Sequence, residues 1–393
     1  MPLPLIALFI AAFAFGTTEF VIAGVLPQVA EGLDVSIPIA GYLVSGYAIG
    51  IAIGGPLMTI ATSGVARRTL LVSLTLIFTA GQAACALAPD FGSMLGLRVA
   101  VAIAHGVFFG VAMVVAVRLV PEDKRGRAVA FVLAGLTVSN IIGVPAGAAI
   151  GNAFGWRATF WAMFALGIVS VGVMLALLPN ARGEASRPQA LAREIRVLGR
   201  QQVWTSLLVM LMLMIGQFVP YTYISPLLTE VTGLDRSDVP WVLLLVGVGC
   251  TVGVFIGGRL ADWHLMPSLI ALTLFQSLVL AAIWFFAPYP VAMVALLTLW
   301  GAVNFTIGTP IQARILSWTA DAPNLASSLI PAGFNLGIAL AASIGAGLLT
   351  AGFSYRSLPV LGIGAMLVAA GVVIASWTAE RRSGAIPPQP AGA

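Results

Sequence analysis

The chain has 393 residues, of which 60% are hydrophobic and only 8% are charged. A soluble globular domain carries roughly a quarter charged residues, so this composition excludes a water-soluble protein and favours one embedded in a lipid bilayer. The net charge of +5 and the pI near 9.7 suit contact with an anionic lipid leaflet, and no motif supports nucleic-acid binding.

Apolar runs long enough to span a bilayer, about 20 residues each, repeat along the whole chain. Lipid permits only helices or closed barrels, because every backbone polar group must be paired internally, and the runs lack the alternation of barrel strands. The expected fold class is therefore an all-α membrane protein with twelve transmembrane helices. We predict them at residues 4–30, 37–62, 69–88, 92–119, 127–150, 157–179, 203–229, 239–261, 266–287, 289–313, 325–351 and 357–378.

The longest polar break divides the chain into two bundles of six helices. We predict an N-terminal bundle over 1–180, a cytoplasmic linker over 181–202, a C-terminal bundle over 203–380 and a cytoplasmic tail over 381–393. Each bundle begins after an even number of spans, so the repeat is parallel. Parallel repeats are typical of transporters that rock around a site near the bilayer midplane.

Glycine ridges support this repeat. Gly46, Gly50 and Gly54 recur 203 residues later (249 − 46) as Gly249, Gly253 and Gly257, and Arg157 recurs 199 residues later (356 − 157) as Arg356. Glycines spaced by four residues form a flat helix face that lets a second backbone approach closely. Two interpretations stay open: tight packing alone, or surfaces that slide during alternating access.

Positive charges predict the orientation of the helices. If the N-terminus is cytoplasmic, all of the 19 Lys and Arg residues except Arg98, Arg157, Arg236 and Arg356 fall on the cytoplasmic side. This asymmetry matches the positive-inside rule. We therefore expect a multi-pass protein of the bacterial cytoplasmic (inner) membrane, with both termini in the cytoplasm.

One acidic residue, Glu19, lies well inside a predicted span. A carboxylate in hydrocarbon is costly, so such residues usually face a cavity and serve transport. Arg98, in the fourth span, is the natural partner by depth, and we hypothesise that it favours ionised Glu19 in one state. A static ion pair that fixes helix packing is the alternative, as is snorkelling of Arg98 to the outer interface.

His105 is the second titratable group predicted inside a span. It has the chemistry to relay protons. A lone membrane histidine also commonly bonds a neighbouring helix, and we rank that interpretation higher. The proton-coupling candidates are thus Glu19, Arg98 and His105, and no cluster with metal-ligand spacing is expected.

Several motifs resemble those of the major facilitator superfamily. Gly258-Arg259-Leu260-Ala261-Asp262 is similar to its G-x-L-a-D signature, whereas the equivalent loop of the first half has Thr59 in place of the acid. Gly143, Pro145 and Gly147 resemble its antiporter motif, with Val144 inserted. The stretch Gly16–Phe20 resembles the twelve-helix drug/proton antiporters of the arabinose-efflux-permease-like branch. The resemblance implies gating roles for Gly258, Arg259, Asp262, Gly143, Pro145 and Gly147.

The resemblance also implies a central cavity between the two bundles. This cavity is implied to lie between spans 1, 2, 4 and 5 of the first half and spans 7, 8, 10 and 11 of the second. The polar and aromatic candidates on these spans are Tyr47, Asn140, Gln217, Tyr221, Tyr223, Trp300, Asn304 and Asn335. An apolar pocket with few polar groups suits amphiphilic small molecules. For each candidate, interhelical hydrogen bonding or a place in the aromatic belt is an equally good explanation.

Three function classes follow. The first is a secondary active transporter that exports small amphiphilic, drug-like molecules in exchange for protons. The second is a metabolite carrier for sugar or nucleoside efflux or uptake. The third, a membrane enzyme or receptor, is disfavoured because no catalytic constellation is present. We expect no cofactor, and we expect the proton to be the coupling ion, because a nucleotide-binding P-loop is absent. The expected partners are a small-molecule substrate and the lipid bilayer, and the expected oligomeric state is a monomer.

Overall fold

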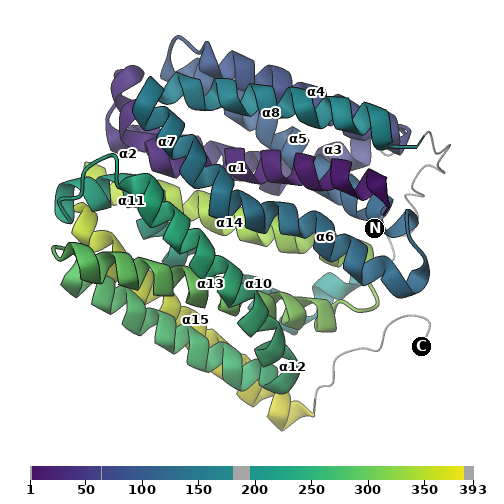
Figure 1. Cartoon of the computed structure of the whole chain (residues 1–393). Helices are drawn as coiled ribbons and strands as arrows, with labels where there is room; N and C mark the ends of the chain where they lie inside the picture. Colours follow the sequence, from purple (N-terminus) through teal and green to yellow (C-terminus); the bar gives the residue numbers. More distant parts are fainter. Residues whose placement is uncertain (1, 63, 180–194, 385–393) are drawn as a thin grey trace. The chain divides into compact units, whose positions relative to one another are not determined.

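The structure is a computed structural model that describes residues 2–62, 64–179 and 195–384 (Figure 1). All regular elements in these ranges are helical, which confirms the expected all-α class. In chain order they are α1 (Leu3–Gly32), α2 (Ile37–Ile49), η1 (Gly50–Gly54), α3 (Gly55–Ala61), α4 (Arg67–Ala86), α5 (Phe91–Arg118), η2 (Glu122–Lys124), α6 (Arg125–Val138), η3 (Ser139–Gly143), α7 (Val144–Phe154), α8 (Trp156–Leu177), η4 (Ile195–Gly199), α10 (Gln201–Thr222), α11 (Ile224–Pro226), η5 (Leu227–Val231), α12 (Val239–Phe286), α13 (Pro290–Trp318), α14 (Pro323–Thr350), η6 (Tyr355–Ser357) and α15 (Leu358–Ser383).

Eleven helices in the described ranges are long and apolar enough to cross a membrane. The sequence predicts twelve, and the difference arises at α12, whose 48 residues contain both the eighth and the ninth predicted spans. His264 breaks the helical backbone there, with φ −146° and ψ 82°, and Pro267 follows it. The single helix α12 therefore contains two predicted spans joined at a kink.

Three predicted spans are interrupted by π-helical turns. These turns are η1 in the second span, η3 in the fifth and η5 in the seventh. A π turn inserts one extra residue into a helix and often marks a functional region. The chain continues through η1 and η3 without a loop, so each of those spans remains a single crossing.

The chain forms two compact units. Unit 1 comprises residues 1–187 with 235–247, and unit 2 comprises 188–234 with 248–393. Residue 180, residues 181–194 of the predicted linker and residues 385–393 of the predicted tail lie outside the described ranges. Arg182, Arg187 and Arg193, three of the arginines assigned to the cytoplasmic side, are among them. The division at 181–202 stays a prediction.

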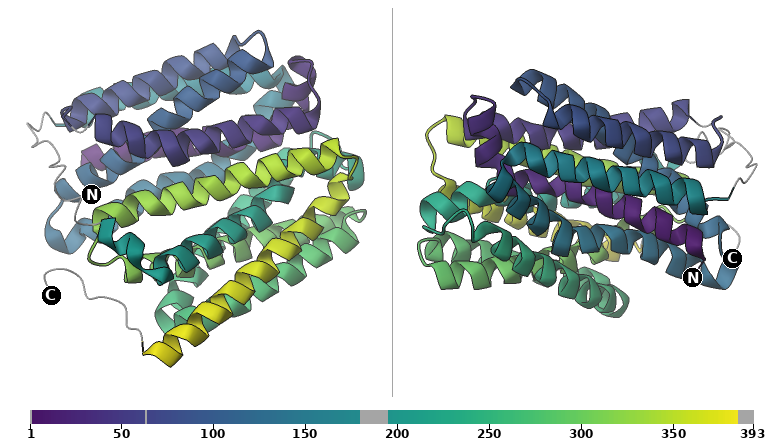
Figure 2. Two further views of the ribbon diagram at one scale, coloured as in Figure 1. Left: turned by 180° about the vertical axis from the view of Figure 1, so that it is seen from behind. Right: turned by 45° about the horizontal axis from the view of Figure 1, so that its top comes forward.

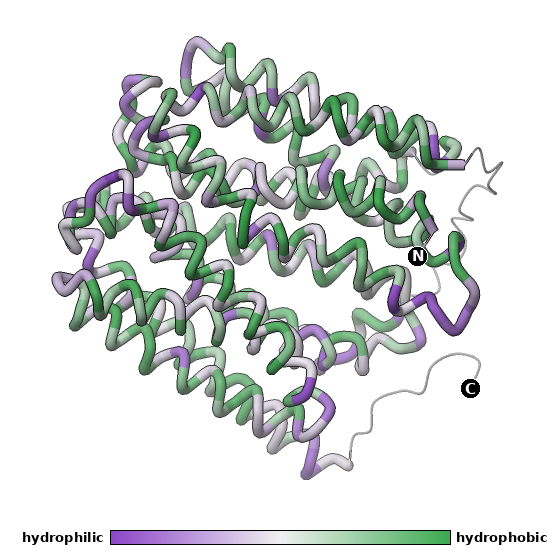
Figure 3. Tube along the Cα trace, viewed as in Figure 1, coloured by the Kyte–Doolittle hydropathy of each residue, from purple (hydrophilic) through white to green (hydrophobic). Residues whose placement is uncertain are grey.

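Hydropathy is distributed as a membrane protein requires. Figure 3 shows that apolar residues fill the helices of each unit, while strongly hydrophilic residues gather mainly at helix ends and turns. The few polar side chains buried along the helices therefore stand out. Because each needs a partner in a region without bulk water, they are the first places to search for function.

Both glycine ridges pack inside their own units. Gly46, Gly50 and Gly54 face α5, where they contact Leu95, Val99, Ala102 and Ile103. Gly253 faces the backbone of α13 in the same way, and Thr306 of that helix donates a hydrogen bond to the Gly253 carbonyl (3.1 Å). Of the two interpretations, the contacts support tight packing within each half of the repeat.

Arg157 and Arg356, which the repeat relates, form equivalent hydrogen bonds in the two halves. Arg157, at the start of α8, donates to the carbonyl of Ala88 just beyond α4 (3.1 Å). Arg356, before α15, donates to the carbonyls of Trp284 and Phe285 at the end of α12 (3.0 and 3.2 Å). Cations stabilise helix C-termini by pairing the free carbonyls and the helix dipole. The 199-residue repeat thus marks one capping interaction in each half.

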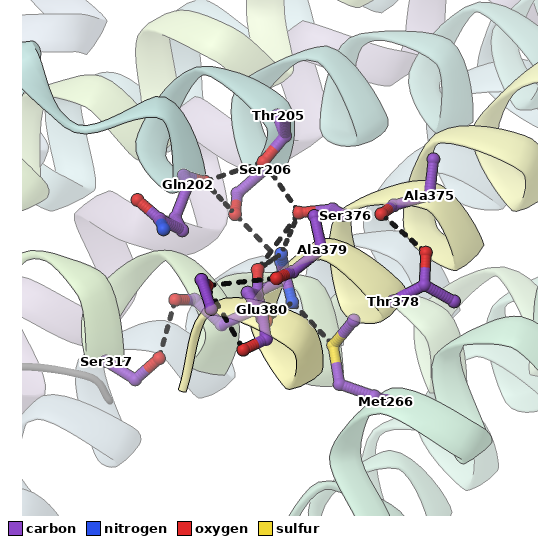
Figure 4. Close-up of polar contacts among 12 residues, drawn as sticks. Gln202, Thr205, Ser206, Met266, Ser317, Ala375, Ser376, Thr378, Ala379 and Glu380 are labelled. Carbon is purple, nitrogen blue, oxygen red and sulfur yellow. Dashed lines mark hydrogen bonds and ion pairs between the residues drawn. The ribbon is translucent and has the colours of Figure 1, made fainter. Parts of the chain in front are cut away.

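In unit 2, α10 packs against both α14 and α15 (Figure 2). A buried ion pair links α13 to α15: Arg314 of α13, only 2% exposed, reaches Glu380 of α15 with Nη2 and Oε1 2.5 Å apart. Arg314 also donates to Ser206 of α10 (2.9 Å) and to Ser376 of α15 (2.7 Å). Figure 4 shows Ser206, Ser376 and Glu380 converging from two helices. Three helices are therefore tied together at one point.

A second ion pair in unit 2 lies outside the spans. Arg200, which precedes α10, donates twice to Asp321 after α13 (2.6 and 2.7 Å) and once to the carbonyl of Trp318 (2.8 Å). Hydrogen bonding from the Arg200 guanidinium lowers the pKa of Asp321 from its ordinary value. This pair holds the start of one helix against the end of another.

The lowered pKa of Asp321 predicts a small loss of stability in acid. A carboxyl whose pKa is lower when folded stabilises the protein above its unfolded pKa, near 3.9, and that contribution disappears as pH falls through the folded pKa. Because both side chains are about one-third exposed, the effect is at most about 1 kcal/mol. Thermal unfolding of the wild type and Asp321→Asn should differ at neutral pH and converge in acid. An equal difference at every pH would contradict this assignment.

Candidate proton-coupling site

Glu19 lies midway along the 30-residue α1, and its side chain is 11% exposed. The residues around it are uncharged, and Gly16 and Gly24 on the same helix let side chains of neighbouring helices approach α1 closely. A carboxyl this far from either helix end is distant from the lipid headgroups, since a helix rises about 1.5 Å per residue. The structure thus confirms that the acid is inside a span and leaves part of it accessible.

His105 of α5 lies within ion-pair distance of this carboxyl. Its Nε2 atom lies 3.9 Å from Oε2 of Glu19, and its imidazole is 5% exposed. The other ring nitrogen, Nδ1, lies 2.9 Å from the hydroxyl of Tyr47 on α2. Phe15 and Phe109 flank the ring, with centroids 5.2 and 5.0 Å away. Three helices therefore bring Tyr47, His105 and Glu19 into one row.

Arg98 makes different contacts from those hypothesised. It is 1% exposed, and it donates to the backbone carbonyls of Leu43 (3.3 Å) and Thr18 (3.4 and 3.5 Å) rather than to the Glu19 carboxylate. Its guanidinium carbon also lies 4.6 Å from the centroid of the Tyr47 ring. The structure thus shows no direct hydrogen bond or ion pair between Arg98 and Glu19 within the described ranges, because the carbonyl oxygens of α1 and α2 and the aromatic face of Tyr47 engage the guanidinium. The hypothesis that Arg98 favours ionised Glu19 in one state stays a prediction.

Two further polar residues extend the site and were not selected from the sequence. The hydroxyl of Thr18 donates to Oε1 of Gln82 on α4 (3.0 Å), and both side chains are buried. The carbonyl of the same Thr18 accepts from Arg98. Adjacency of Thr18 to Glu19 was a usable signal, and so was the position of Gln82, a polar residue inside the predicted span 69–88.

The motif glycines of the fifth span contact α1 beside this site. Gly143 faces Thr17, Gly147 faces Val21 and Gly151 faces Val25, so residues spaced by four on one helix meet residues spaced by four on the other. Thr159 of α8 adds a hydrogen bond to the carbonyl of Gly147 (2.8 Å). Pro145 is buried in the same helix. The motif thus builds a close seam between α1 and α7.

Filling this seam is expected to disrupt the protein. A side chain at Gly147 would clash with Val21 and press on Thr159, so Gly147→Val should cost about 1–3 kcal/mol and lower the melting temperature in detergent. Gly172→Val is the matched control, because nothing lies within 4 Å of a Cβ placed at Gly172. Equal melting temperatures for the two variants would show that the seam tolerates expansion.

The motif Gly258–Asp262, expected in a loop after the eighth span, lies inside α12, just before the kink at His264. Arg259 and Asp262 are exposed, and neither forms an ion pair with any residue in the described ranges. Gly258 is partly buried, with open space around it, while its neighbour Gly257 packs on Thr306 of α13. The gating roles of Gly258, Arg259 and Asp262 stay a prediction.

The candidate substrate residues of unit 2 form a compact group of uncharged side chains. Tyr221 of α10 stacks on Trp300 of α13, with centroids 5.5 Å apart and an angle of 14°. Gln217 precedes Tyr221 by one helical turn, and Asn304 follows Trp300 by one turn. Because α10 and α13 run in opposite directions, both residues lie on the same side of the stack. Neither Nε1 of Trp300 nor the amide of Gln217 has a hydrogen-bond partner in the described ranges.

The remaining candidate substrate residues form hydrogen bonds to other groups of the protein. Asn335 donates to the carbonyl of Pro331 (3.1 Å), although its Oδ1 has no partner in the ranges described. Tyr223 is fully buried and donates to the carbonyl of Ala342 (3.0 Å), which makes it an interhelical contact. In unit 1, Asn140 donates to the carbonyl of Leu136 (3.0 Å), and Tyr47 belongs to the row with His105.

Comparisons with known proteins identify the family. The family model described as Major Facilitator Superfamily matches residues 8–317. "Inner membrane transport protein YdhP" of Escherichia coli (strain K12) is 41% identical over 342 residues, 87% of each chain. "Chloramphenicol resistance protein" of Streptomyces lividans is 34% identical over 343 residues, 86% of this chain and 87% of that protein.

Solved structures agree on the fold. The crystal structure of a D-xylose-proton symporter has a TM-score of 0.74 at 17% identity and covers 93% of this chain and 96% of that one. A bacterial homologue of the human lysosomal transporter Spinster has a TM-score of 0.70 at 15% identity, covering 95% and 94%. The chain is therefore a membrane transporter, not an enzyme, and belongs to the Major Facilitator Superfamily.

Proposed function

We propose that this transporter exports small amphiphilic, drug-like molecules in exchange for protons, with Glu19 as the proton-binding group. One observation carries the proposal: a carboxyl midway along a transmembrane helix, 11% exposed, with an imidazole nitrogen 3.9 Å away. Intramembrane acids are costly and are retained chiefly where they bind ions or protons during transport. The chloramphenicol resistance relative, 34% identical, supports the direction of export.

Glu19 has the surroundings that proton exchange requires. A carboxylate in a dry site is unfavourable unless it is paired, whereas the neutral acid is tolerated there. Access to water or approach of His105 favours loss of the proton, and closure of the site favours its uptake. Arg98, held by the carbonyls of Thr18 and Leu43, places a fixed positive charge beside the site without neutralising Glu19 directly.

The uncharged group of unit 2 supplies the substrate contacts in this proposal. The stacked Tyr221 and Trp300 offer flat apolar faces, and the free groups of Gln217, Trp300 and Asn335 offer hydrogen bonds. A buried polar group without a partner costs about 1–3 kcal/mol, so a substrate that pairs with it gains affinity. Such a group binds a molecule with an aromatic or apolar body and a few hydrogen-bonding substituents.

The rest of the predicted arrangement belongs to the same proposal. The two bundles, divided in the 181–202 linker, alternate access in a bacterial inner membrane with both termini in the cytoplasm. Gly143, Pro145, Gly147, Gly258, Arg259 and Asp262 serve the conformational change. The transporter acts as a monomer and uses the proton as its coupling ion.

Substrate-driven proton movement tests the proposal. The purified protein is reconstituted into proteoliposomes that contain a pH-sensitive dye, and chloramphenicol is added as the first probe. Antiport predicts a proton flux opposite to the flux of the drug, and a drug accumulation that collapses when an ionophore removes the pH gradient. Drug transport at a rate independent of the pH gradient would refute proton coupling, and the protein would then be a facilitator.

A ligand panel separates drug export from metabolite transport. Ligand binding raises the melting temperature by mass action, so drugs, sugars and nucleosides can be ranked on the same purified protein. The hydrogen-bonding residues Gln217, Asn304 and Asn335 favour the metabolite alternative as well, because hydroxyl-rich molecules also pair with amides. Stabilisation by sugars or nucleosides alone would replace the drug assignment with a metabolite carrier.

A further inference from the structure

We propose that Tyr47 is a positioning residue for the proton-binding acid, acting through His105. Its hydroxyl donates to Nδ1 of His105, which fixes the neutral imidazole with its proton on Nε2, and that N–H is aimed at Glu19. The inference rests on the proposed function, in which Glu19 carries the proton. It assigns a role to Tyr47 that differs from contact with the substrate.

The geometry supplies the first argument. The Tyr47 oxygen and His105 Nδ1 are 2.9 Å apart, an ordinary hydrogen-bond length, and both side chains are buried. His105 Nε2 and Glu19 Oε2 are 3.9 Å apart, so a shift of about 1 Å would form a charge-assisted hydrogen bond. The imidazole therefore has one nitrogen engaged and the other facing the acid.

The number of protons available supplies the second argument. A neutral imidazole carries one N–H, whereas an ionised carboxylate can only accept hydrogen bonds. A lone pair on Nε2 facing ionised Glu19 would be repelled, so the proton belongs on Nε2 and Nδ1 must accept. Tyr47 carries the O–H that Nδ1 needs. With phenylalanine at position 47, Nδ1 would lose this donor and the imidazole its preferred tautomer.

The fixed position of Tyr47 supplies the third argument. Arg98 lies over its ring and also donates to the carbonyl of Leu43, one turn earlier on the same face of α2. These two contacts clamp the part of α2 that carries the phenol. The titratable or charged groups facing His105 and Tyr47 are Glu19, Arg98 and Cys85, and none of them hydrogen-bonds Nδ1 within the described ranges.

The chain is well suited to a direct test, because it contains only two histidines, His105 and His264. His264 lies at the kink of α12 in unit 2 and stacks on Trp263. In protein carrying His264→Gln and labelled with ¹⁵N-histidine, every imidazole signal comes from His105. Solid-state NMR in bilayers at alkaline pH should show a protonated Nε2 and an unprotonated, hydrogen-bonded Nδ1.

Substitution of Tyr47 should change that spectrum. Tyr47→Phe is expected to shift the Nδ1 resonance and to produce a mixture of tautomers. Tyr42→Phe is the matched control, because Tyr42 is 40% exposed on the same helix and should leave the signals of His105 unchanged. A proton on Nδ1 in the parent protein, or identical spectra for Tyr47→Phe and the parent, would overturn the inference.

Transport then tests the consequence for Glu19. Without an oriented N–H the ionised acid cannot gain the hydrogen bond that a shift of about 1 Å would form, so the pH of half-maximal proton-coupled transport should rise by about one unit in Tyr47→Phe. An unshifted pH profile in a folded Tyr47→Phe protein would count against the positioning role. If the NMR result holds while Glu19→Gln still transports uphill, the proposed function fails and the tautomer assignment survives.

Discussion

Glu19→Gln is expected to abolish proton-driven accumulation of the probe drug in proteoliposomes. Glutamine keeps the size of the side chain and its hydrogen-bonding capacity, but it cannot gain or lose a proton in the relevant range. Exchange of labelled for unlabelled drug, which needs binding and alternating access but no net proton movement, should persist. The expected pattern is therefore complete loss of uphill transport with exchange retained.

The appropriate control lies on the same helix. Glu31, near the end of α1, is 74% exposed and forms only a loose ion pair with Arg236 at 3.6 Å. Exposed ion pairs contribute little, so Glu31→Gln should transport as the wild type does. Loss of uphill transport in both variants would point to a general effect of charge removal from α1. Persistence of uphill transport in Glu19→Gln would exclude this carboxyl as the proton carrier.

Glu380→Ala should cause the largest loss of stability. It would leave Arg314, which is 2% exposed, without its carboxylate in the interior of unit 2. Breaking a buried pair by removing one partner typically costs about 3–5 kcal/mol, because the remaining charge stays buried. Unfolding in mixed detergent micelles should therefore occur at a much lower fraction of denaturing detergent. Restoration by Glu380→Asp would tie the effect to the charge rather than to side-chain volume.

An exposed ion pair provides the comparison. Glu122 and Arg125 lie 2.8 Å apart, but their side chains are 84% and 49% exposed. Water screens this pair, so Glu122→Ala should leave the unfolding midpoint nearly unchanged. If Glu122→Ala and Glu380→Ala destabilise the protein equally, burial of Arg314 and Glu380 does not govern their contribution.

Much of the fold was predictable from composition and periodicity. Apolar length determines that helices span the membrane, and the structure places helices over every predicted span. The Gly46 and Gly249 ridges and the Arg157 and Arg356 pair identified the repeat, since small residues and helix caps are needed at matching places in both halves. The sequence did not predict that the eighth and ninth spans join in α12 through a kink at His264.

The proton-coupling site was predicted only in part. Glu19 and His105 were selectable because titratable groups are rare inside spans. Their pairing was not, because the depth of a side chain read from uncertain span boundaries is too coarse to choose between two residues on the same helix. Depth suggested Arg98 as the partner of Glu19, whereas the structure places Arg98 against the carbonyls of Thr18 and Leu43 and His105, about 10 Å further along α5, beside the acid. Residues 98 and 105 are seven apart, so both face the same general direction on one helix.

The C-terminal ion pair shows a second limit. Arg314 and Glu380 are 66 residues apart in the chain, and each lies close to a helix terminus, where charged residues commonly face water. Sequence position alone assigned Arg314 to the positive cytoplasmic side. Only the packing of α10, α13 and α15 shows that the guanidinium is buried and tied to Ser206, Ser376 and Glu380.

Proton release on substrate binding is the most direct measurement of the central claim. Purified transporter in weakly buffered detergent solution is mixed with the probe drug while a pH dye records protons in the medium. The account predicts that the wild type releases protons as it binds the drug and that Glu19→Gln binds the drug without releasing any. Undiminished release from Glu19→Gln would contradict it.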